Sequence, residues 1–193
     1  MDTKKEKSIT EILASYSTDK ESFHHYGKVY EEIFEKFDRE ASLNILEVGT
    51  QKGGSLLAWK EYFPNATVYG VDIVDVVPEE YRKDTVTRVI SDIKEWRNDI
   101  KWDIVIDDGS HYLLDVAYVI ANYVIKLKIG GVLVIEDVRH PSLLTRVAEN
   151  LCQDMGIAFP DEKFDYRMGA LYYDTSSPDS RGSAIIALYK DGI

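Results

Sequence analysis

The chain has 193 residues, of which 45% are hydrophobic and 30% charged, a composition typical of one soluble globular domain. Its formal net charge of −11 would repel a phosphate backbone and argues against DNA or RNA as a partner. No apolar run is long enough to span a bilayer, and no apolar signal-peptide core follows the charged N-terminus, so we expect a cytoplasmic protein without a membrane partner.

Hydrophobic periodicity predicts two helices at the start of the chain and then an alternation of strands and helices. The helices are expected over 8–16, 21–37, 55–62, 112–127 and 141–155. Strands are expected over 43–48, 67–72, 86–91, 102–106 and 132–135, and 128–131 is expected to form a turn. Residues 170–174 and 184–190 have the pattern of a hairpin. The sequence therefore predicts an α/β fold with a mostly parallel sheet, helices on both faces and a C-terminal antiparallel hairpin.

A glycine-rich loop follows the first predicted strand and leads into a helix. Gly49 and Gly53 allow the backbone to approach a ligand closely at the helix N-terminus. Gln51 stands where a dinucleotide-binding loop needs its second glycine, and the loop lacks the Gly-Lys-Ser/Thr of a P-loop. The acidic Glu47 would repel a pyrophosphate but suits a ligand with an amino group and a sulfonium cation. S-adenosylmethionine has both groups.

Three further acids end predicted strands on the same side of the sheet. Asp72 is placed to accept hydrogen bonds from two ribose hydroxyls. Asp92 is placed to contact an adenine amino group, and we assign Asp107 to the same cofactor. Each could instead lie in a solvated loop or cap a helix. The agreement of successive strand ends favours the cofactor interpretation.

The ends of the strands predicted over 102–106 and 132–135 form an acidic centre. Asp108, Glu136 and Asp137 are hard oxygen donors suited to Mg²⁺ or another oxygen-preferring divalent cation. His111, three residues after Asp108, could serve as a general base. The alternatives are that the aspartates cap the next helix, that Glu136 and Asp137 pair with an arginine or lysine, and that the histidine is structural.

Together these motifs resemble the class I S-adenosylmethionine-dependent methyltransferases. The similarity is specifically to the metal-dependent sugar O-methyltransferases of the mycinamicin and macrocin type and to cephalosporin-hydroxylase-like proteins. The motifs that carry it are EVGTxxGGS (47–55), DDGSH (107–111), GG (130–131) and IED (135–137), with TDK (18–20), HHY (24–26) and Tyr30 upstream. The chain departs from this pattern by lacking the N-terminal domain of the larger macrolide enzymes and by leaving little room for a helix between 90 and 102.

The resemblance implies a Rossmann-like fold in which residues 1–40 form a helical segment on the substrate side, or a lid, and residues 41–193 form the cofactor-binding catalytic domain. It implies metal ligands at Asp108, Glu136 and Asp137, with Asp108 and His111 catalytic. The cofactors implied are S-adenosylmethionine and Mg²⁺. The implied cofactor contacts are Glu47, Gly49, Gly53, Asp72, Asp92 and Asp107.

The predicted reaction is transfer of the sulfonium methyl to a hydroxyl of a sugar or glycoside, since two neighbouring oxygens can chelate one cation. A homo-oligomer is compatible with the sequence. Two rival functions are an S-adenosylmethionine-binding protein without turnover and a nicotinamide-dependent oxidoreductase, which Gln51 disfavours. A hydroxylase is disfavoured because no facial set of two histidines and a carboxylate is evident.

Overall fold

The computed structural model describes residues 6–83, 85–138, 144, 146–148, 150, 151, 166–174 and 184–192, with 166–174, 191 and 192 described by their backbone alone. Within the continuously described ranges, the helices are α1 (Ile9–Leu13), α2 (Asp19–Ser22), α3 (Gly27–Phe34), α4 (Gly54–Tyr62) and α5 (Leu113–Tyr123), with 3-10 turns η1 (Glu79–Tyr81) and η2 (Val124–Lys126). The strands are β1 (Asn44–Val48), β2 (Thr67–Asp72), β3 (Val86–Ile90), β4 (Trp102–Asp107), β5 (Leu127–Ile135), β6 (Tyr166–Asp174) and β7 (Ala184–Gly192). In the described part of the chain, no helix is long and apolar enough to cross a membrane.

The strands of the described residues form one sheet in the order β3-β2-β1-β4-β5-β7-β6. The strands from β3 to β5 pair in parallel, whereas β7 is antiparallel to both β5 and β6. This confirms the predicted parallel sheet with a C-terminal hairpin. The strand order reverses between β1 and β4, and in open α/β sheets ligands bind beyond the carboxyl ends of the strands at such a point.

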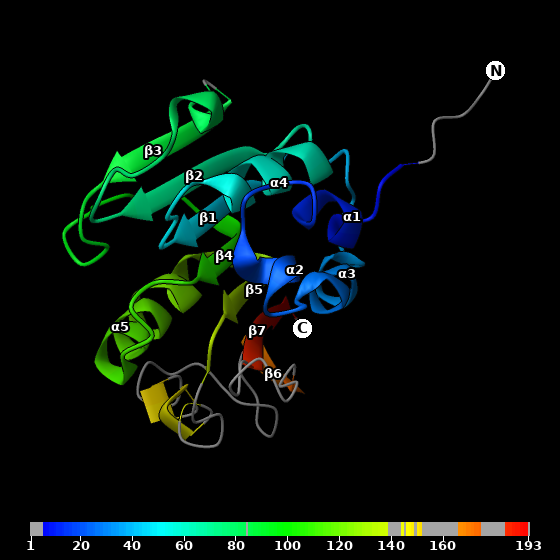
Figure 1. Ribbon diagram of the computed structural model, residues 1–193. Helices are drawn as coiled ribbons and strands as arrows, with labels where there is room; N and C mark the ends of the chain where they lie inside the picture. The colour runs from blue at the N-terminus through cyan, green and yellow to red at the C-terminus, as the bar shows by residue number, and fades with distance from the viewer. Residues whose placement is uncertain are drawn as a thin grey trace.

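Successive side chains of each strand point to opposite faces, and each face has its own core. Ile104 and Ile106 pack in one cluster with residues of α1, α3 and α4, whereas Val105 packs in the other with residues of α5. Figure 1 shows α5 on the opposite side of the sheet from α1, α3 and α4. The sheet is therefore covered on both faces, as its apolar strands require.

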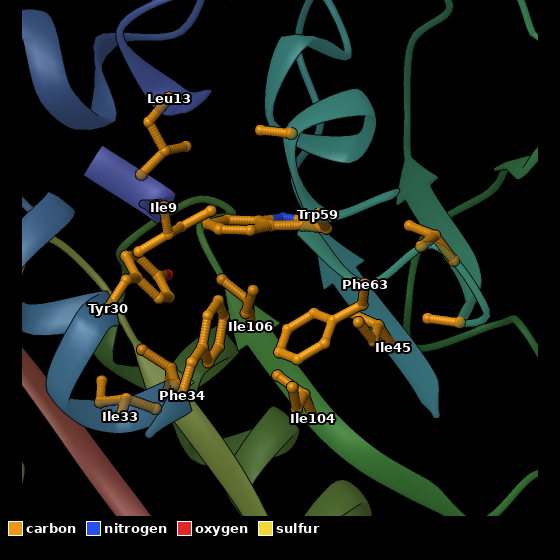
Figure 2. Packing of buried hydrophobic residues seen from close by; sticks show 14 of the residues in the cluster. Ile9, Leu13, Tyr30, Ile33, Phe34, Ile45, Trp59, Phe63, Ile104 and Ile106 are labelled. Carbon is orange, nitrogen blue, oxygen red and sulfur yellow. The ribbon is translucent and has the colours of Figure 1, made fainter. Parts of the chain in front are cut away.

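The first core is centred on aromatic side chains from α3 and α4 (Figure 2). The rings of Tyr30 and Trp59 lie 4.8 Å apart between centroids, and Phe34 meets Trp59 edge to face at 5.6 Å. Ile9 and Leu13 of α1 are fully buried in the same cluster. The N-terminal helices thus share a hydrophobic core with the sheet.

The single helix predicted over 21–37 is wrong, because the chain forms α2 and α3 with a turn between them. His25 has a left-handed backbone with a φ of 57°, which ends a right-handed helix. The N–H of Tyr26 donates to the carbonyl of Lys20 at 2.7 Å and closes the turn. The break redirects the chain so that Lys20 and the side chains of α3 reach the same end of the sheet.

The predicted turn over 128–131 is also wrong, because these residues belong to β5. The register shifts between the pairs Trp102–Leu127 and Ile104–Val132, so Asp103 lies opposite four residues of β5. Gly130, with a φ of 79°, provides the backbone freedom that this irregularity needs. The predicted helix over 112–127 correspondingly ends at Tyr123 and continues only as the turn η2.

The remaining helices and strands lie close to their predicted ranges, including α4 and the hairpin strands β6 and β7. Of the helix expected over 141–155, the described residues 144, 146–148, 150 and 151 are helical. The other residues of that range, and the hairpin connection at 175–183, lie outside the described part of the chain.

Gly49 joins the end of β1 to the end of β4. Its φ is 81°, and a Cβ at this position would lie 2.1 Å from the backbone oxygen of Asp108. We expect Gly49→Ala to lower the free energy of unfolding by at least about 2 kcal/mol, because it adds a backbone clash to the strain of a left-handed alanine. Urea denaturation would measure this loss.

Gly130→Ala is the matched control, since Gly130 has a φ of 79° and nothing within 4 Å of a Cβ. It should cost only the conformational strain, about 1 to 2 kcal/mol. Equal losses for the two variants would show that the contact between Gly49 and Asp108 is not what demands glycine.

Candidate active site

A cavity of about 420 Å³ lies beyond the carboxyl ends of the central parallel strands. This volume is within the range of pockets that hold a small ligand or cofactor. A larger groove of about 600 Å³ lies elsewhere, along Glu6–Glu11, and none of the strand-end acids lines it. The cavity beyond the strands is therefore the candidate site, and residues that line it include Gly49, Gln51, Asp72, Asp92, Asp107, Asp108, His111 and Asp137.

Asp72, at the end of β2, holds the glycine loop in place. Its Oδ2 atom accepts hydrogen bonds from the backbone N–H of Thr50 at 2.8 Å and of Gln51 at 2.9 Å. Its Oδ1 atom accepts from the N–H of Val74 at 3.2 Å. Asp92, after β3, lines the same cavity and accepts from the N–H of Lys94 at 2.8 Å. The two acids border one end of the cavity together with apolar residues, namely Val71, Ile73, Val74, Val76 and Ile93.

Asp107, the last residue of β4, is a buried carboxyl group with incomplete hydrogen bonding. Its Oδ1 atom accepts from the N–H of Gly109 at 3.3 Å, but its buried Oδ2 atom has no hydrogen-bond partner among the described residues. Burial raises the pKa of Asp107 to about 7. A buried polar atom without a partner on a cavity wall indicates a place where a ligand can complete the hydrogen bonding.

The raised pKa of Asp107 predicts a change of stability with pH. Because the folded state favours the protonated carboxyl group, its contribution is fully present below the unfolded pKa near 4 and is lost as the pH rises through about 7. Between pH 5 and pH 8, ionisation of Asp107 should lower the unfolding free energy of the native protein by about 2 to 3 kcal/mol. The Asp107→Asn variant should lack this part of the fall. Urea denaturation of both proteins in EDTA, across this range, would measure it. If the unfolding free energies of the two proteins changed equally with pH, the raised pKa of Asp107 would be contradicted.

Asp108, His111 and Asp137 bring three donor atoms together, all within 4.8 Å of one another. The Nε2 atom of His111 lies 3.9 Å from Asp108 Oδ1 and 3.7 Å from Asp137 Oδ2. Each of the three side chains is about one quarter exposed or less. His111 and Asp137 also have left-handed backbones, with φ of 57° and 53°. Such conformations in non-glycine residues are costly and cluster at functional sites.

Lys20 lies behind these residues, almost fully buried among carboxylates. Its Nζ atom is 2.7 Å from Asp108 Oδ2, 2.7 Å from Glu136 Oε2 and 3.2 Å from Glu47 Oε1. Burial by itself would lower the pKa of Lys20, but the carboxylates of Asp108, Glu136 and Glu47 raise it well above its ordinary value. The lysine is therefore charged at neutral pH.

The carboxylates around Lys20 carry more negative charge than one lysine balances. Burial raises the pKa of Glu47, Asp108 and Glu136, and Lys20 offsets only part of that rise. Asp137 adds a fourth acid at the cavity wall. Buried carboxylates in excess are relieved by a bound cation, and carboxylate oxygens are the donors that Mg²⁺ prefers. The donor set thus fits a divalent cation.

Two tyrosines of the N-terminal segment hold further oxygens of these acids. The Tyr26 hydroxyl donates to Asp137 Oδ1 at 2.5 Å, and the Tyr30 hydroxyl makes a short hydrogen bond to Glu136 Oε1. Both tyrosines are fully buried, so their rings are part of the core and do not line the cavity. Their polar ends face the acids and their apolar rings face the sheet, as is usual for buried tyrosine.

The structure separates the predicted site residues into two groups. Gly49, Asp72, Asp92, Asp107, Asp108, His111 and Asp137 line the cavity. Glu47, Gly53 and Glu136 are not among the lining residues. Glu47 is fully buried and accepts hydrogen bonds from Ser55 at 2.8 Å and Trp59 at 3.1 Å. Gly53, with a φ of 76°, is the N-cap of α4.

Two of the alternatives considered for the acids can be compared with the structure. Neither Asp107 nor Asp108 caps α5, because the N-cap is Tyr112 and no side chain caps it. Glu136 does pair with a lysine, Lys20. The spacing of residues along the sequence could not predict this contact, because Lys20 is 116 residues from Glu136. The motif at 18–20 was the one signal that could have drawn attention to it.

No family model matches the chain. Among curated proteins, it is 33% identical over 142 residues to 8-demethyl-8-alpha-L-rhamnosyl tetracenomycin-C 2'-O-methyltransferase of Streptomyces olivaceus. It is 34% identical over 143 residues to mycinamicin VI 2''-O-methyltransferase of Micromonospora griseorubida. These matches cover 66% and 67% of the chain but only 37% and 35% of the relatives. The chain therefore spans about a third of the length of these curated proteins.

Among solved structures, the chain resembles the MycE methyltransferase of mycinamycin biosynthesis in complex with Mg, SAH and mycinamycin VI. The TM-score is 0.70 at 21% identity, over 97% of this chain and 56% of the other. It also resembles a precorrin-6y C5,15-methyltransferase of Geobacter metallireducens, with a TM-score of 0.58 at 17% identity, over 91% and 94% of the two chains. The chain has the Rossmann-like class I methyltransferase fold and is a homologue of the sugar O-methyltransferases of the tetracenomycin, mycinamicin and macrocin type.

Proposed function

We propose that the chain provides the methyl-transfer site of an S-adenosylmethionine-dependent O-methyltransferase that acts on a sugar hydroxyl with the help of a divalent cation such as Mg²⁺. The observation that carries the proposal is the meeting of Asp108, His111 and Asp137 at the wall of a cavity beyond β1 and β4. The relatives are named for sugar and glycoside O-methylation, which supports a glycoside as the acceptor.

The cavity has the groups that S-adenosylmethionine needs along its length. Asp72 borders it at the end of β2, where its Oδ1 atom can accept from ribose hydroxyls while Oδ2 keeps the glycine loop closed. Asp92 and the apolar side chains around it suit the adenine base. Asp107 Oδ2 can take a hydrogen bond from the amino group of the methionine part. Glu47 would contribute to cofactor binding indirectly, because its hydrogen bond with Trp59 holds α4 in place.

Asp108 and Asp137 are proposed as the cation ligands nearest the cavity. Donor atoms on one Mg²⁺, at 2.0–2.1 Å each, lie up to about 4 Å apart, and the nearest oxygens of Asp108 and Asp137 lie within 4.8 Å of each other, so a small adjustment lets both bind one cation. Glu136 remains the third proposed ligand. Its two oxygens already accept from Lys20 and Tyr30, but each carboxylate oxygen has a second lone pair that can be shared.

His111 is proposed as the base that accepts the proton of the acceptor hydroxyl. Its left-handed backbone directs Nε2 between Asp108 and Asp137, where both carboxylates stabilise the imidazolium that forms. Bound S-adenosylmethionine supplies an electrophilic methyl group, and a bound cation supplies Lewis acidity toward the hydroxyl. The described residues of the N-terminal segment contribute Asp19 to the cavity wall, which supports a place on the acceptor side for that segment.

The proposal is tested by calorimetric titration with S-adenosylmethionine and S-adenosylhomocysteine, with and without Mg²⁺, followed by assays on a panel of glycosides. We expect cofactor binding in all cases and methyl transfer only with the cation. Binding without any acceptor would favour a protein that holds the cofactor without turnover. Binding of NADH in place of S-adenosylmethionine would favour an oxidoreductase, and no cofactor binding would contradict the proposal.

A further inference from the structure

Lys20 contacts three carboxylates with one ammonium group: it donates hydrogen bonds to Asp108 and Glu136 and forms an ion pair with Glu47. An ammonium has three N–H donors, and Asp108, Glu136 and Glu47 each have one oxygen within 3.2 Å of its nitrogen. The lysine is 1% exposed, so water does not compete for these donors. Its contacts come from the ends of β1 and β4 and from the residue after β5. Lys20 therefore ties three strand ends to the N-terminal segment at one point.

Of the three carboxylates in contact with Lys20, only Asp108 lines the cavity. Its Oδ2 atom faces Lys20, and its Oδ1 atom lies 3.9 Å from His111 Nε2. The other oxygens of Glu47 and Glu136 are directed at donors from the core. These donors are Ser55, Trp59 and Tyr30. The lysine thus binds the rear oxygen of Asp108 and leaves the front oxygen toward the cavity.

Asp137 is held in a similar way by Tyr26, and His24 Nδ1 lies 3.3 Å from the same carboxylate oxygen. Its Oδ1 atom accepts from the Tyr26 hydroxyl at 2.5 Å, and its Oδ2 atom lies 3.7 Å from His111 Nε2. Each of the two carboxylates beside His111 therefore has one oxygen fixed by the N-terminal segment and one facing the histidine. The difference is that Asp108 is held by the ammonium group of a lysine.

We propose that Lys20 is a positioning residue that takes the place of a second divalent cation behind Asp108, so that the acidic centre binds a single cation. Metal ions of two-metal sites lie about 3.5–4 Å apart and share carboxylates. Lys20 lies on one oxygen of Asp108 while the other oxygen faces the proposed cation, which is the arrangement of a bridged pair with an ammonium in one position. This inference rests on the proposed cation-assisted function.

Mn²⁺ is a suitable probe, because it takes oxygen ligands and its bound and free forms can be counted by electron paramagnetic resonance. We expect the native chain, with S-adenosylhomocysteine present, to bind one Mn²⁺ per chain. Lys20→Met removes the charge but keeps a side chain of similar length. It should bind two Mn²⁺ per chain, with a spectrum broadened by coupling between the ions. A Lys20→Met variant that binds one Mn²⁺ with a Kd within twofold of the native value would overturn the inference.

Two controls separate the charge of Lys20 from its hydrogen bonds. Lys20→Arg keeps the positive charge, and Tyr30→Phe removes a different donor from the same cluster. Both should bind one Mn²⁺ per chain, and two on either would contradict the proposed role of the lysine charge. The native titration also decides the question if a variant does not fold, because two coupled Mn²⁺ ions in the native chain would overturn the inference. Absence of any Mn²⁺ binding by the native chain would instead contradict the proposed cation-assisted function.

Discussion

His111→Ala is expected to lower the rate of methyl transfer to a glycoside hydroxyl by about 10²- to 10⁴-fold, the usual contribution of a positioned general base. The imidazole Nε2 atom lies between Asp108 and Asp137, and no other histidine lines the cavity in the described part of the chain. Binding of S-adenosylhomocysteine should change by less than about twofold. The measurement is a single-turnover assay of methyl transfer beside a calorimetric titration.

His25→Ala is the matched control for this variant. His25 has the same backbone φ of 57° as His111, so both substitutions place alanine in a left-handed conformation, but His25 is exposed and does not line the cavity. Its replacement should leave the transfer rate within about twofold of the native rate. If His111→Ala were no slower than His25→Ala, the proton would have another acceptor and the role proposed for His111 would be wrong.

Lys20→Met is expected to lower the free energy of unfolding by about 3 to 5 kcal/mol at neutral pH, the usual cost of removing one partner from a buried ionic network. Three carboxylates lose the positive charge that balances them, and two of them, Glu47 and Glu136, are almost fully buried. Urea denaturation in EDTA would measure the loss. Lys28→Met, at an exposed position of α3, is the control and should change stability by less than about 0.5 kcal/mol.

The loss in Lys20→Met should depend on pH in a defined direction. Burial already raises the pKa of Glu47, Asp108 and Glu136, and removal of Lys20 raises each further. When these carboxyl groups are protonated they are neutral and do not need the charge of Lys20. The loss of unfolding free energy in the variant therefore grows as the pH rises and the groups deprotonate. The deficit should therefore be smaller at pH 5 than at pH 8. A deficit that is equal at both values would mean that packing of the lysine side chain, and not its charge, stabilises the fold.

The sequence predicted the fold well where local pattern is sufficient. The apolar runs of β1, β2 and β4 and the glycine loop before α4 appear close to their predicted ranges. It failed at 23–26 and at 128–131. The first failure arose because a single left-handed residue, His25, breaks a stretch of helical composition. In the second, pairing with β4 overrides the local turn preference of two glycines.

The candidate site could be predicted as a location but not as a set of contacts. Parallel strands place their carboxyl ends at one edge, so the acids at or just after the ends of β2, β3, β4 and β5 gather there. The alternation of side chains in β1 also indicates which way Glu47 faces. Glu47 has the parity of Ile45, which packs in the cluster of Trp59, so its carboxylate faces the core with that tryptophan.

By itself, the sequence determined the order of the elements, the parallel sheet and the edge at which the acids meet, because these follow from short-range periodicity and turn chemistry. Only the tertiary structure decided which acids face the cavity. Glu136 and Asp137 are neighbours in sequence, yet Glu136 is held in the interior by Lys20 and Tyr30 while Asp137 lines the cavity. Lys20 reaches Asp108 from 88 residues away. Such a contact depends on how α2 packs against the sheet, and no spacing along the chain encodes it.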